Sequence, residues 1–444
     1  MKNIFNEKFS INFIKREALA GLTTFMTMSY IIFLQPGILE KAGMNFEAAL
    51  AATVIASAFA TLLMGLIANY PIALAPGMGE NYFFTFTLVP ACAALSITDT
   101  APWQTALGVV AVAGIIFLIL SLLGLRKAII NAMSTNMKHG AAAGIGFFIA
   151  FIGLKNAGFI TSNPGTLVQL NPDLITTNTL IFLTGLIVTI VLFVLKIRGA
   201  VLLGILAATT TAVITGHAQL TMPISKPPDI TPVFFKLDLI NVFDNIIKLL
   251  PLIIILLFMD IFDTLGTLVG VAEQGGFTKD GKIPRLEKAM FADAAGTALG
   301  GFIGNSTVTS YVESTTGVES GGRTGLTACF TALFFILALF FTPFVETVAK
   351  CPPATAAALI VVGAMMMKNV TEIDWSDYSE CIPAFLTVIG IPLTYSIADV
   401  LSLGFISYPL IKICSGKIKE INWLMMTIGL ILILYFIFIR PELG

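Results

Sequence analysis

Two aspartates interrupt a long apolar stretch of this sequence. The segment FMDIFDTLGTLVG, residues 258–270, follows the wholly apolar run PLIIILLF and places Asp260 and Asp263 three residues apart. In a helix this spacing puts both carboxylates on one face. An ionisable group in such surroundings is costly and is a functional candidate by default. We interpret both as binding residues. The alternative is that they cap hydroxyl or backbone groups, which an Asp-Thr pair does readily.

A polar segment separates two other apolar stretches. Residues 304–325 read GNSTVTSYVESTTGVESGGRTG and include Thr309, Ser310 and Glu313. This composition is unsuited to a helix that faces lipid. Irregular backbone at membrane depth is tolerated only where protein buries it or where it lines a cavity. We therefore predict a short extended segment followed by a half-helix, which together form one wall of a binding site.

A second interruption has the same character. Residues 71–80, PIALAPGMGE, contain two prolines and two glycines, end at Glu80 and are followed by Asn81. Paired interruptions at corresponding places are the best sequence indication of a transporter's binding site. The N-terminus of a half-helix there would offer free N–H groups to a ligand. The two interruptions thus predict a substrate site near the middle of the membrane.

These side chains suit a flat, nitrogen-rich ligand. A carboxylate can accept two hydrogen bonds from neighbouring N–H groups of a planar ring. An acid that is alternately buried and hydrated can also take up and release a proton, which is what proton-coupled transport requires. Phe25 lies near the site in the predicted arrangement and could stack on the ring, although packing is the plainer interpretation.

The composition indicates a polytopic α-helical membrane protein. Only 11% of residues are charged, 57% are hydrophobic and the mean hydropathy is +0.92. About twenty apolar residues cross a bilayer core, and such runs recur along the chain. Clear spans are predicted at 18–39, 46–68, 105–123, 178–195, 199–217, 247–272, 326–348 and 421–439. Shorter ones are predicted at 72–90, 141–157, 286–304, 354–368, 381–395 and 398–413.

Other totals exclude several classes of protein. A net charge of −1 gives no basic surface for nucleic acid. Five cysteines without a CxxC spacing and two histidines argue against a disulfide framework or a metal centre. We expect no cofactor and no enzymatic activity. The amphipathic, charged N-terminus does not resemble a cleaved signal peptide.

Lysine and arginine in short loops predict the orientation. These residues form clusters in four places. When the spans are counted alternately from a cytoplasmic N-terminus, all four clusters fall on the cytoplasmic side. These are the N-terminal arm (Lys2, Lys8, Lys15, Arg16), the loop after residue 123 (Arg126, Lys127, Lys138), the pair Lys196 and Arg198, and the loop 273–290 (Lys279, Lys282, Arg285, Lys288). The side of the C-terminus stays open, because the pattern weakens after residue 350.

The chain contains an internal duplication. Shifted by 236 residues, ASAFATLLMGLIAN (56–69) aligns with ADAAGTALGGFIGN (292–305), with seven of fourteen positions identical and no gap. The first interruption then aligns with the second. Asp293 lies in the aligned helix, and we interpret it as structural. If each copy holds seven spans, the two copies have opposite orientations in the membrane.

Taken together, four segments resemble the nucleobase:cation symporter-2 family, and most closely its AzgA-like branch of adenine, guanine and hypoxanthine permeases. The similarity runs from about residue 17 to the end of the chain. The segments that carry it are PIALAPGMGENYFF, LFMDIFDTLGTLVGVA, ADAAGTALGGFIGNSTVTSYVESTTGVESGGRTGLTA and IPAFLTVIGIPLTYSIAD.

The resemblance implies a fold and a site. The fold has about fourteen spans in two inverted repeats of seven, with short strands in spans 3 and 10. The core domain would comprise 1–135 and 247–352, and the gate domain 136–246 and 353–444. By the family's motifs, Asp260 and Glu313 would bond the purine, while Asp263 and Asn81 would shape the site or serve coupling.

The resemblance also implies a function: import of adenine, hypoxanthine or guanine with protons, by alternating access. The protein would be a multi-pass protein of the plasma membrane with a cytoplasmic N-terminus, in contact with lipid, and could form a homodimer through the gate. One departure is that GMGENYFF replaces the usual GMGLNAYF. Glu80 adds a carboxylate and Tyr82 replaces a small residue, so the preferred base and the coupling ion stay open.

Three alternatives remain. The same fold could carry xanthine, uracil or another small solute, with Na⁺ as an alternative coupling ion, because fold does not fix cargo. A passive channel is a second. A membrane-embedded transferase using the DIFD acids with a metal is the third. It is less favoured, since the chain has no basic residue near Glu313 at depth to hold a diphosphate.

Overall fold

The computed structural model describes residues 10–95, 100–123, 133–219, 224–278 and 283–443. Of the cationic residues used to predict orientation, Lys2, Lys8, Arg126, Lys127, Lys279 and Lys282 lie outside these ranges. Within them, eight helices are long and apolar enough to cross a membrane. The chain is therefore an integral membrane protein, as its composition predicts.

The two copies of the duplicated half begin with matching series of elements. In the first copy these are α1 (Ile11–Met28), α2 (Tyr30–Lys41), α3 (Phe46–Leu63), β1 (Leu74–Pro76), α4 (Met78–Phe83), α5 (Val89–Ala94) and α6 (Pro102–Leu122). In the second they are α12 (Ile246–Gln274), α13 (Leu286–Ile303), β4 (Val308–Ser310), α14 (Ser314–Glu319), α15 (Gly325–Ala338) and α16 (Thr342–Ala349).

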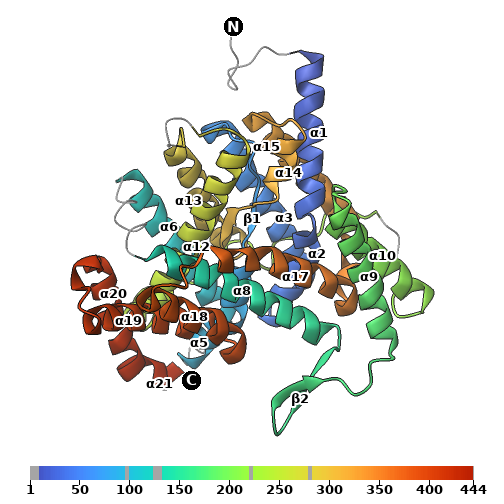
Figure 1. Ribbon diagram of the computed structural model, residues 1–444. Helices are drawn as coiled ribbons and strands as arrows, with labels where there is room; N and C mark the ends of the chain where they lie inside the picture. The colour runs from blue at the N-terminus through green and yellow to red at the C-terminus, as the bar shows by residue number, and fades with distance from the viewer. Residues whose placement is uncertain (1–9, 96–99, 124–132, 220–223, 279–282, 444) are drawn as a thin grey trace.

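The remaining elements complete each copy. The first adds α8 (Thr135–Asn156), a hairpin of β2 (Ile160–Asn163) and β3 (Leu167–Leu170), α9 (Thr177–Val194), α10 (Ala200–Ile214) and α11 (Leu239–Asp244). The second adds α17 (Pro352–Met366), α18 (Tyr378–Thr394), α19 (Ile397–Cys414), α20 (Trp423–Leu434) and α21 (Arg440–Leu443). If β4 is counted with α14 and α15 with α16, seven spans of the second copy precede the apolar helix α20. In Figure 1, α1 begins at the top and α21 ends at the bottom.

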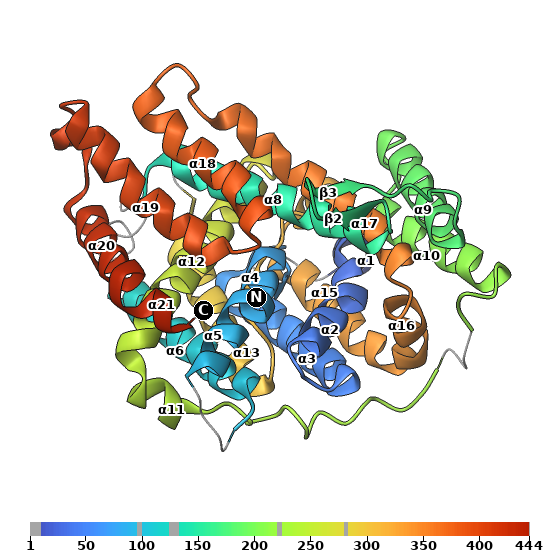
Figure 2. The same cartoon turned by 90° about the horizontal axis from the view of Figure 1, so that it is seen from below.

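The helices separate into two packed groups. In Figure 2, α8, α17, α18 and α9 form a row along one side, while α2, α3, α4, α13 and α15 cluster on the other. Within the cluster, α13 packs against α6 and α3, and α15 packs against α1 and α3. Within the row, α8 packs against both α17 and α18. These pairings join the first copy to the second, as expected for intertwined repeats.

Small residues allow these helices to approach closely. A Cβ atom added to Gly301 of α13 would lie 2.9 Å from the Leu107 carbonyl oxygen of α6, and one added to Gly140 of α8 would lie 2.8 Å from the Ala384 oxygen of α18. Membrane helices associate through such van der Waals contacts, because lipid removes the usual hydrophobic driving force. Side-chain caps mark several helix starts, for example Ser10 on α1 and Ser134 on α8.

The two interruptions meet at the centre of the molecule. β1 pairs with β4 as an antiparallel two-stranded sheet in which Leu74 faces Ser310, two residues that are 236 apart, as in the duplication. The threonine shared by both copies supports each strand: Thr61 bonds the amide and carbonyl of Leu74 at 2.9 Å, and Thr297 bonds those of Val308 at 3.1 Å. The predicted strands in spans 3 and 10 are confirmed, and equivalent threonines satisfy their backbone.

Candidate functional site

Half-helices α4 and α14 start beside this crossing, and the predicted site residues lie around it. Asp260 and Asp263 come from the middle of α12, which packs against β4, α4 and α14. Thr309 and Ser310 belong to β4, Glu313 directly precedes α14, and Glu80 and Asn81 lie in α4. The fold therefore gathers three distant segments of the chain at one place.

Two neighbouring carboxylates of the site, Asp260 and Asp293, are both buried. The single hydroxyl proton of Thr297 is shared between Oδ2 of Asp260 at 2.9 Å and the Val308 carbonyl at 3.1 Å, and Thr264 donates to Oδ1 of Asp293 at 2.6 Å. Asp260 is 2% exposed and Asp293 is fully buried. Their other oxygens, Oδ1 of Asp260 and Oδ2 of Asp293, have no hydrogen-bond partner among the described residues. Sequence analysis interpreted Asp293 as structural; its proximity to Asp260 was not visible in the sequence.

Asp263 differs from Asp260 in its access to solvent. Thr309 donates to Oδ2 of Asp263 at 3.1 Å, yet the aspartate is exposed. One turn and two turns further along the same face of α12, Gly266 is exposed and Gly270 is half-buried, and nothing lies within 4 Å of a Cβ atom added to either. An accessible stripe thus runs from Asp263 toward the end of α12 at Gln274, which lies at the start of the lysine-rich segment 273–290.

Glu313 has a partner that sequence analysis missed. The Tyr30 hydroxyl donates to Oε1 of Glu313 at 2.7 Å, from the start of α2 where the first span breaks between two helices. The rings of Tyr30 and Tyr311 are 6.3 Å apart. Tyr311 in turn donates to the Pro76 carbonyl at 2.6 Å. The signal available in the sequence was a buried tyrosine at an interrupted helix, which is too common to single out.

The segment GMGENYFF, which departs from the usual family motif, also lies at this crossing. Glu80 is 2% exposed and lies close enough to Asp263 and Asp260 for electrostatic repulsion. A Cβ atom at Gly77 would overlap the Glu80 carboxylate and lie 3.0 Å from Oγ1 of Thr309. A side chain at position 77 would therefore displace the Glu80 carboxylate. Asn81 is fully buried.

Two further predicted site residues, Phe25 and Ser310, have different neighbours. Phe25 packs against Phe334 and Phe335 of α15, with ring centroids 5.9 and 5.4 Å away. The amide of Ser310 donates to Thr264 at 3.3 Å, while its buried hydroxyl has no partner among the described residues. Stacking of Phe25 on a ligand and contact of Ser310 with it stay predictions.

Aromatic rings form a closure between the two groups of helices. Tyr82 of α4 lies 5.7 Å from Phe148 of α8, and Phe148 lies 5.2 Å from Tyr395, which follows α18. The tyrosine of the departure motif therefore forms part of this closure.

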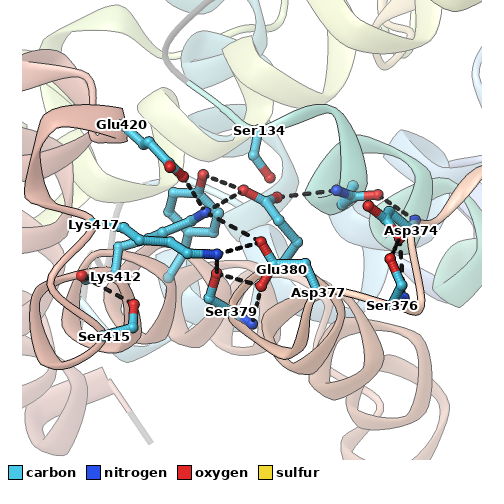
Figure 3. Close-up of polar contacts among 12 residues, drawn as sticks. Ser134, Asp374, Ser376, Asp377, Ser379, Glu380, Lys412, Ser415, Lys417 and Glu420 are labelled. Atoms are coloured by element: carbon cyan, nitrogen blue, oxygen red, sulfur yellow. Dashed lines mark hydrogen bonds and ion pairs between the residues drawn. The ribbon is translucent and has the colours of Figure 1, made fainter.

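A second polar cluster lies in the row of α8 and α18. Lys412 is 1% exposed and bonds Glu380 at 2.8 Å and Glu420 at 2.6 Å, while Lys417 bonds Asp377 at 2.6 Å (Figure 3). Glu380 also accepts from Tyr408 and from Asn136 of α8. This gate cluster, comprising Lys412, Lys417, Asp377, Glu380 and Glu420, ties the ends of α8, α18 and α19 to the segment before α20. Sequence analysis did not identify it.

Among the described residues, no three histidine, cysteine, aspartate or glutamate side chains are arranged to hold a metal ion.

Comparison with known proteins gives the context of this geometry. A family model described as "Permease family" matches residues 15–438. The permease MJ0326 of Methanocaldococcus jannaschii is 48% identical over 98% of this chain and 97% of its own length. The guanine/hypoxanthine permease PbuO of Bacillus subtilis is 41% identical over 98% and 99%, and the adenine permease AdeP of Escherichia coli is 37% identical over 96% and 93%.

Solved structures show the same fold at low sequence identity. The transmembrane domain of the cyanobacterial bicarbonate transporter BicA superposes with a TM-score of 0.63 at 18% identity, covering 88% of this chain and 98% of that one. SLC26A9 gives a TM-score of 0.65 at 13% identity, covering 92% of this chain and 66% of its own. These likenesses concern the fold alone.

Proposed function

This chain belongs to the nucleobase:cation symporter-2 family of permeases, and from this premise we propose that it imports purine nucleobases together with protons by alternating access. Relatives whose names give guanine, hypoxanthine or adenine as their substrate match nearly the whole chain. This supports a purine as the cargo, and it supports a transporter rather than an enzyme. Guanine, hypoxanthine and adenine are the bases to test first.

One observation carries the proposal. Four acids from three segments, Asp260, Asp263, Asp293 and Glu313, meet at the strand crossing with hydroxyl groups as their partners, and among the described residues none of them forms an ion pair with lysine or arginine. Acids held in this way can bond a neutral base and can gain or lose a proton, because no fixed cation holds them charged.

We assign the acids two roles by their access to solvent. Asp263, which is exposed, and Glu313, which is half-buried, would accept hydrogen bonds from N–H groups of the purine. Asp260 was predicted to contact the base. Since it is buried against Thr297 beside Asp293, it would instead share the coupling proton with that residue through their two free oxygens. Asn81 would contact the base from α4.

The open stripe and the aromatic closure correspond to one state of the cycle. If the N-terminus is cytoplasmic, as the lysine and arginine pattern predicts, the lysine-rich segment 273–290 would lie in the cytoplasm and this state would be the inward-open one. In the outward-open state, Tyr82 would separate from Phe148 and the stripe on α12 would close against the gate. A plasma-membrane location and a homodimer through the gate belong to the same proposal.

Uptake of radiolabelled hypoxanthine, guanine and adenine in cells lacking their own permeases tests the function. We expect accumulation that a protonophore abolishes. Accumulation that follows a Na⁺ gradient would favour sodium coupling, and uptake that never exceeds equilibrium would favour a channel. If none of the three bases enters although the protein is in the membrane, the proposed cargo is wrong.

Four variants separate binding from coupling. Asp263→Asn and Glu313→Gln should lose both binding and uptake. Asp260→Asn and Asp293→Asn should keep exchange of labelled for unlabelled base but lose proton-driven accumulation. Asp229→Asn, in an exposed loop, is the matched control and should behave as wild type. Loss of exchange in all four core variants would contradict the division of roles.

A further inference from the structure

A chain of buried amides and one hydroxyl leads into the site from behind the strand crossing. Gln35 of α2 donates through Nε2 to Oγ of Ser306 at 3.1 Å and to Oδ1 of Asn305 at 3.3 Å. Ser306 donates to Oδ1 of Asn81 at 2.5 Å. All four residues are at most 1% exposed. Neither Gln35 nor Ser306 was singled out by the sequence.

We propose that Gln35 is a positioning residue which, through Ser306, makes Asn81 a hydrogen-bond donor toward the base and thereby favours 6-oxopurines over adenine. The inference rests on the proposed function, because it assigns Asn81 to the base. It adds which of the purines the site prefers and which residues outside the site decide this.

The direction of the hydrogen-bond chain is fixed at one end by a group that can only accept. Nδ2 of Asn81 donates to the Pro76 carbonyl at 3.4 Å, and Tyr311 donates to the same oxygen. A backbone carbonyl has no proton to give. In the structure Asn81 turns its nitrogen toward Pro76 and its oxygen toward Ser306. Because Oδ1 needs a donor, the single proton of Ser306 lies on that bond.

The donor and the acceptor at the other end of this hydrogen-bond chain follow from that orientation. Once Ser306 has committed its proton to Asn81, its oxygen can only accept from Gln35. The amide nitrogen of Gln35 supplies that donor, which a carboxylate or a hydrocarbon side chain could not. Gln35 thus holds the serine hydroxyl in the orientation that keeps Oδ1 of Asn81 occupied.

This polarity has a consequence for base selection. Asn81 keeps one spare N–H, whereas its oxygen is engaged. An asparagine pairs with adenine in bidentate fashion by accepting from the 6-amino group and donating to N7, and so needs its oxygen free. A 6-oxopurine presents two acceptors, N7 and O6, on that edge. A donor-only Asn81 therefore matches guanine and hypoxanthine and cannot make the bidentate contact with adenine.

Competition for hypoxanthine uptake tests the inference. We would measure inhibition constants of unlabelled adenine and guanine for wild type, Ser306→Ala and Gln35→Met. Ser306→Ala frees the oxygen of Asn81, so the ratio of adenine to guanine inhibition constants should fall by about 3- to 10-fold, the value of one neutral hydrogen bond. Gln35→Met only releases the serine proton from its fixed orientation. The ratio of adenine to guanine inhibition constants should therefore also fall in this variant, but by less than in Ser306→Ala.

Two controls keep the hydrogen-bond chain intact. Ser306→Thr retains a hydroxyl and should restore the wild-type ratio. Thr307→Val removes the adjacent buried hydroxyl, which has no partner among the described residues, and should leave the ratio unchanged. Membrane amounts and melting temperatures of every variant are measured in parallel.

The outcomes are distinct. If wild type takes up no purine, the proposed function fails. If wild type takes up purines but Ser306→Ala and Gln35→Met change all inhibition constants equally, or change only protein amount, the inference is wrong although the function stands. Should Ser306→Ala not reach the membrane, Gln35→Met still decides the inference through the same ratio, with Ser306→Thr as its control.

Discussion

Two clusters of acids in this molecule have opposite partners. In the core, the acids at the strand crossing accept hydrogen bonds from hydroxyl groups, as Asp263 does from Thr309 and Glu313 from Tyr30. In the gate cluster, the acids are paired with cations: Glu380 with the buried Lys412 and Asp377 with Lys417. The same residue types thus occur with fixed charge compensation in one region and without it in the other.

The difference separates structural acids from acids that can take part in transport. A neighbouring ammonium group keeps a carboxylate charged. Hydrogen bonds from Lys417 and Ser379 hold the pKa of the Asp377 carboxyl well below its usual range. Acids bonded only to hydroxyls are free to change protonation and to exchange partners with a ligand. We therefore expect variants of the gate cluster to alter stability and variants of the core to alter transport.

The largest expected effect is on stability. Lys412→Met leaves Glu380 without its buried cation and should lower the free energy of unfolding by about 3–5 kcal/mol. Thermal unfolding of the purified protein in detergent would measure this. The matched control is Lys350→Met, whose pair with Glu346 is exposed on one helix turn and is worth about 0.3–0.5 kcal/mol. A changed affinity for purine with unchanged stability would contradict the comparison.

The next effect is on binding. Tyr30→Phe removes the hydroxyl that holds Glu313, and a hydrogen bond to a charged group is worth about 1.5–3 kcal/mol. Because this bond forms without ligand, its loss should lower the melting temperature, and the KM for purine should rise because Glu313 is no longer held in position. Tyr378→Phe, at a tyrosine that is 74% exposed, is the control. Tighter binding in Tyr30→Phe would mean that the tyrosine competes with the base for Glu313.

Equivalent threonines in the two copies allow a sharper test. Thr61→Val and Thr297→Val each remove the hydroxyl that bonds a strand, and each should cost about 1–3 kcal/mol of stability because buried backbone groups lose a partner. Only Thr297 also donates to Asp260. Thr297→Val should therefore shift the pH dependence of uptake, and Thr61→Val should not. Equal pH profiles would show that Asp260 has no part in coupling.

The smallest effect concerns pH. Because the folded-state pKa of Asp377 is depressed, its contribution to stability is complete above the unfolded value of about 3.9 and is lost only as pH falls through the folded value. Melting temperatures of wild type and Asp377→Asn should differ by a constant amount between pH 8 and 5. Proton-driven uptake should rise over the same range. If the difference in melting temperature between wild type and Asp377→Asn vanishes by pH 5, Lys417 does not keep Asp377 charged.

Much of the fold could be predicted from the sequence. Apolar runs of spanning length, the register of 236 residues and the two Pro/Gly- and hydroxyl-rich interruptions gave the spans, the repeats and the paired strands, because each of these is a local property of the chain. The acids Asp260, Asp263 and Glu313 could be singled out for the same reason: a carboxylate within an apolar run is visible without coordinates.

The partners of these acids were decided by the tertiary structure. Tyr30 and Glu313 are 283 residues apart, and Gln35 and Ser306 are 271 apart. Asp293 comes beside Asp260 only because α13 packs next to α12, and Lys412 meets its acids only where α19 ends beside α18. Residue type and spacing determined which groups could do chemistry. Which hydroxyl, amide or cation each group faces depends on how helices from the two copies interlock, and this decides whether an acid stays charged, binds a base or carries a proton.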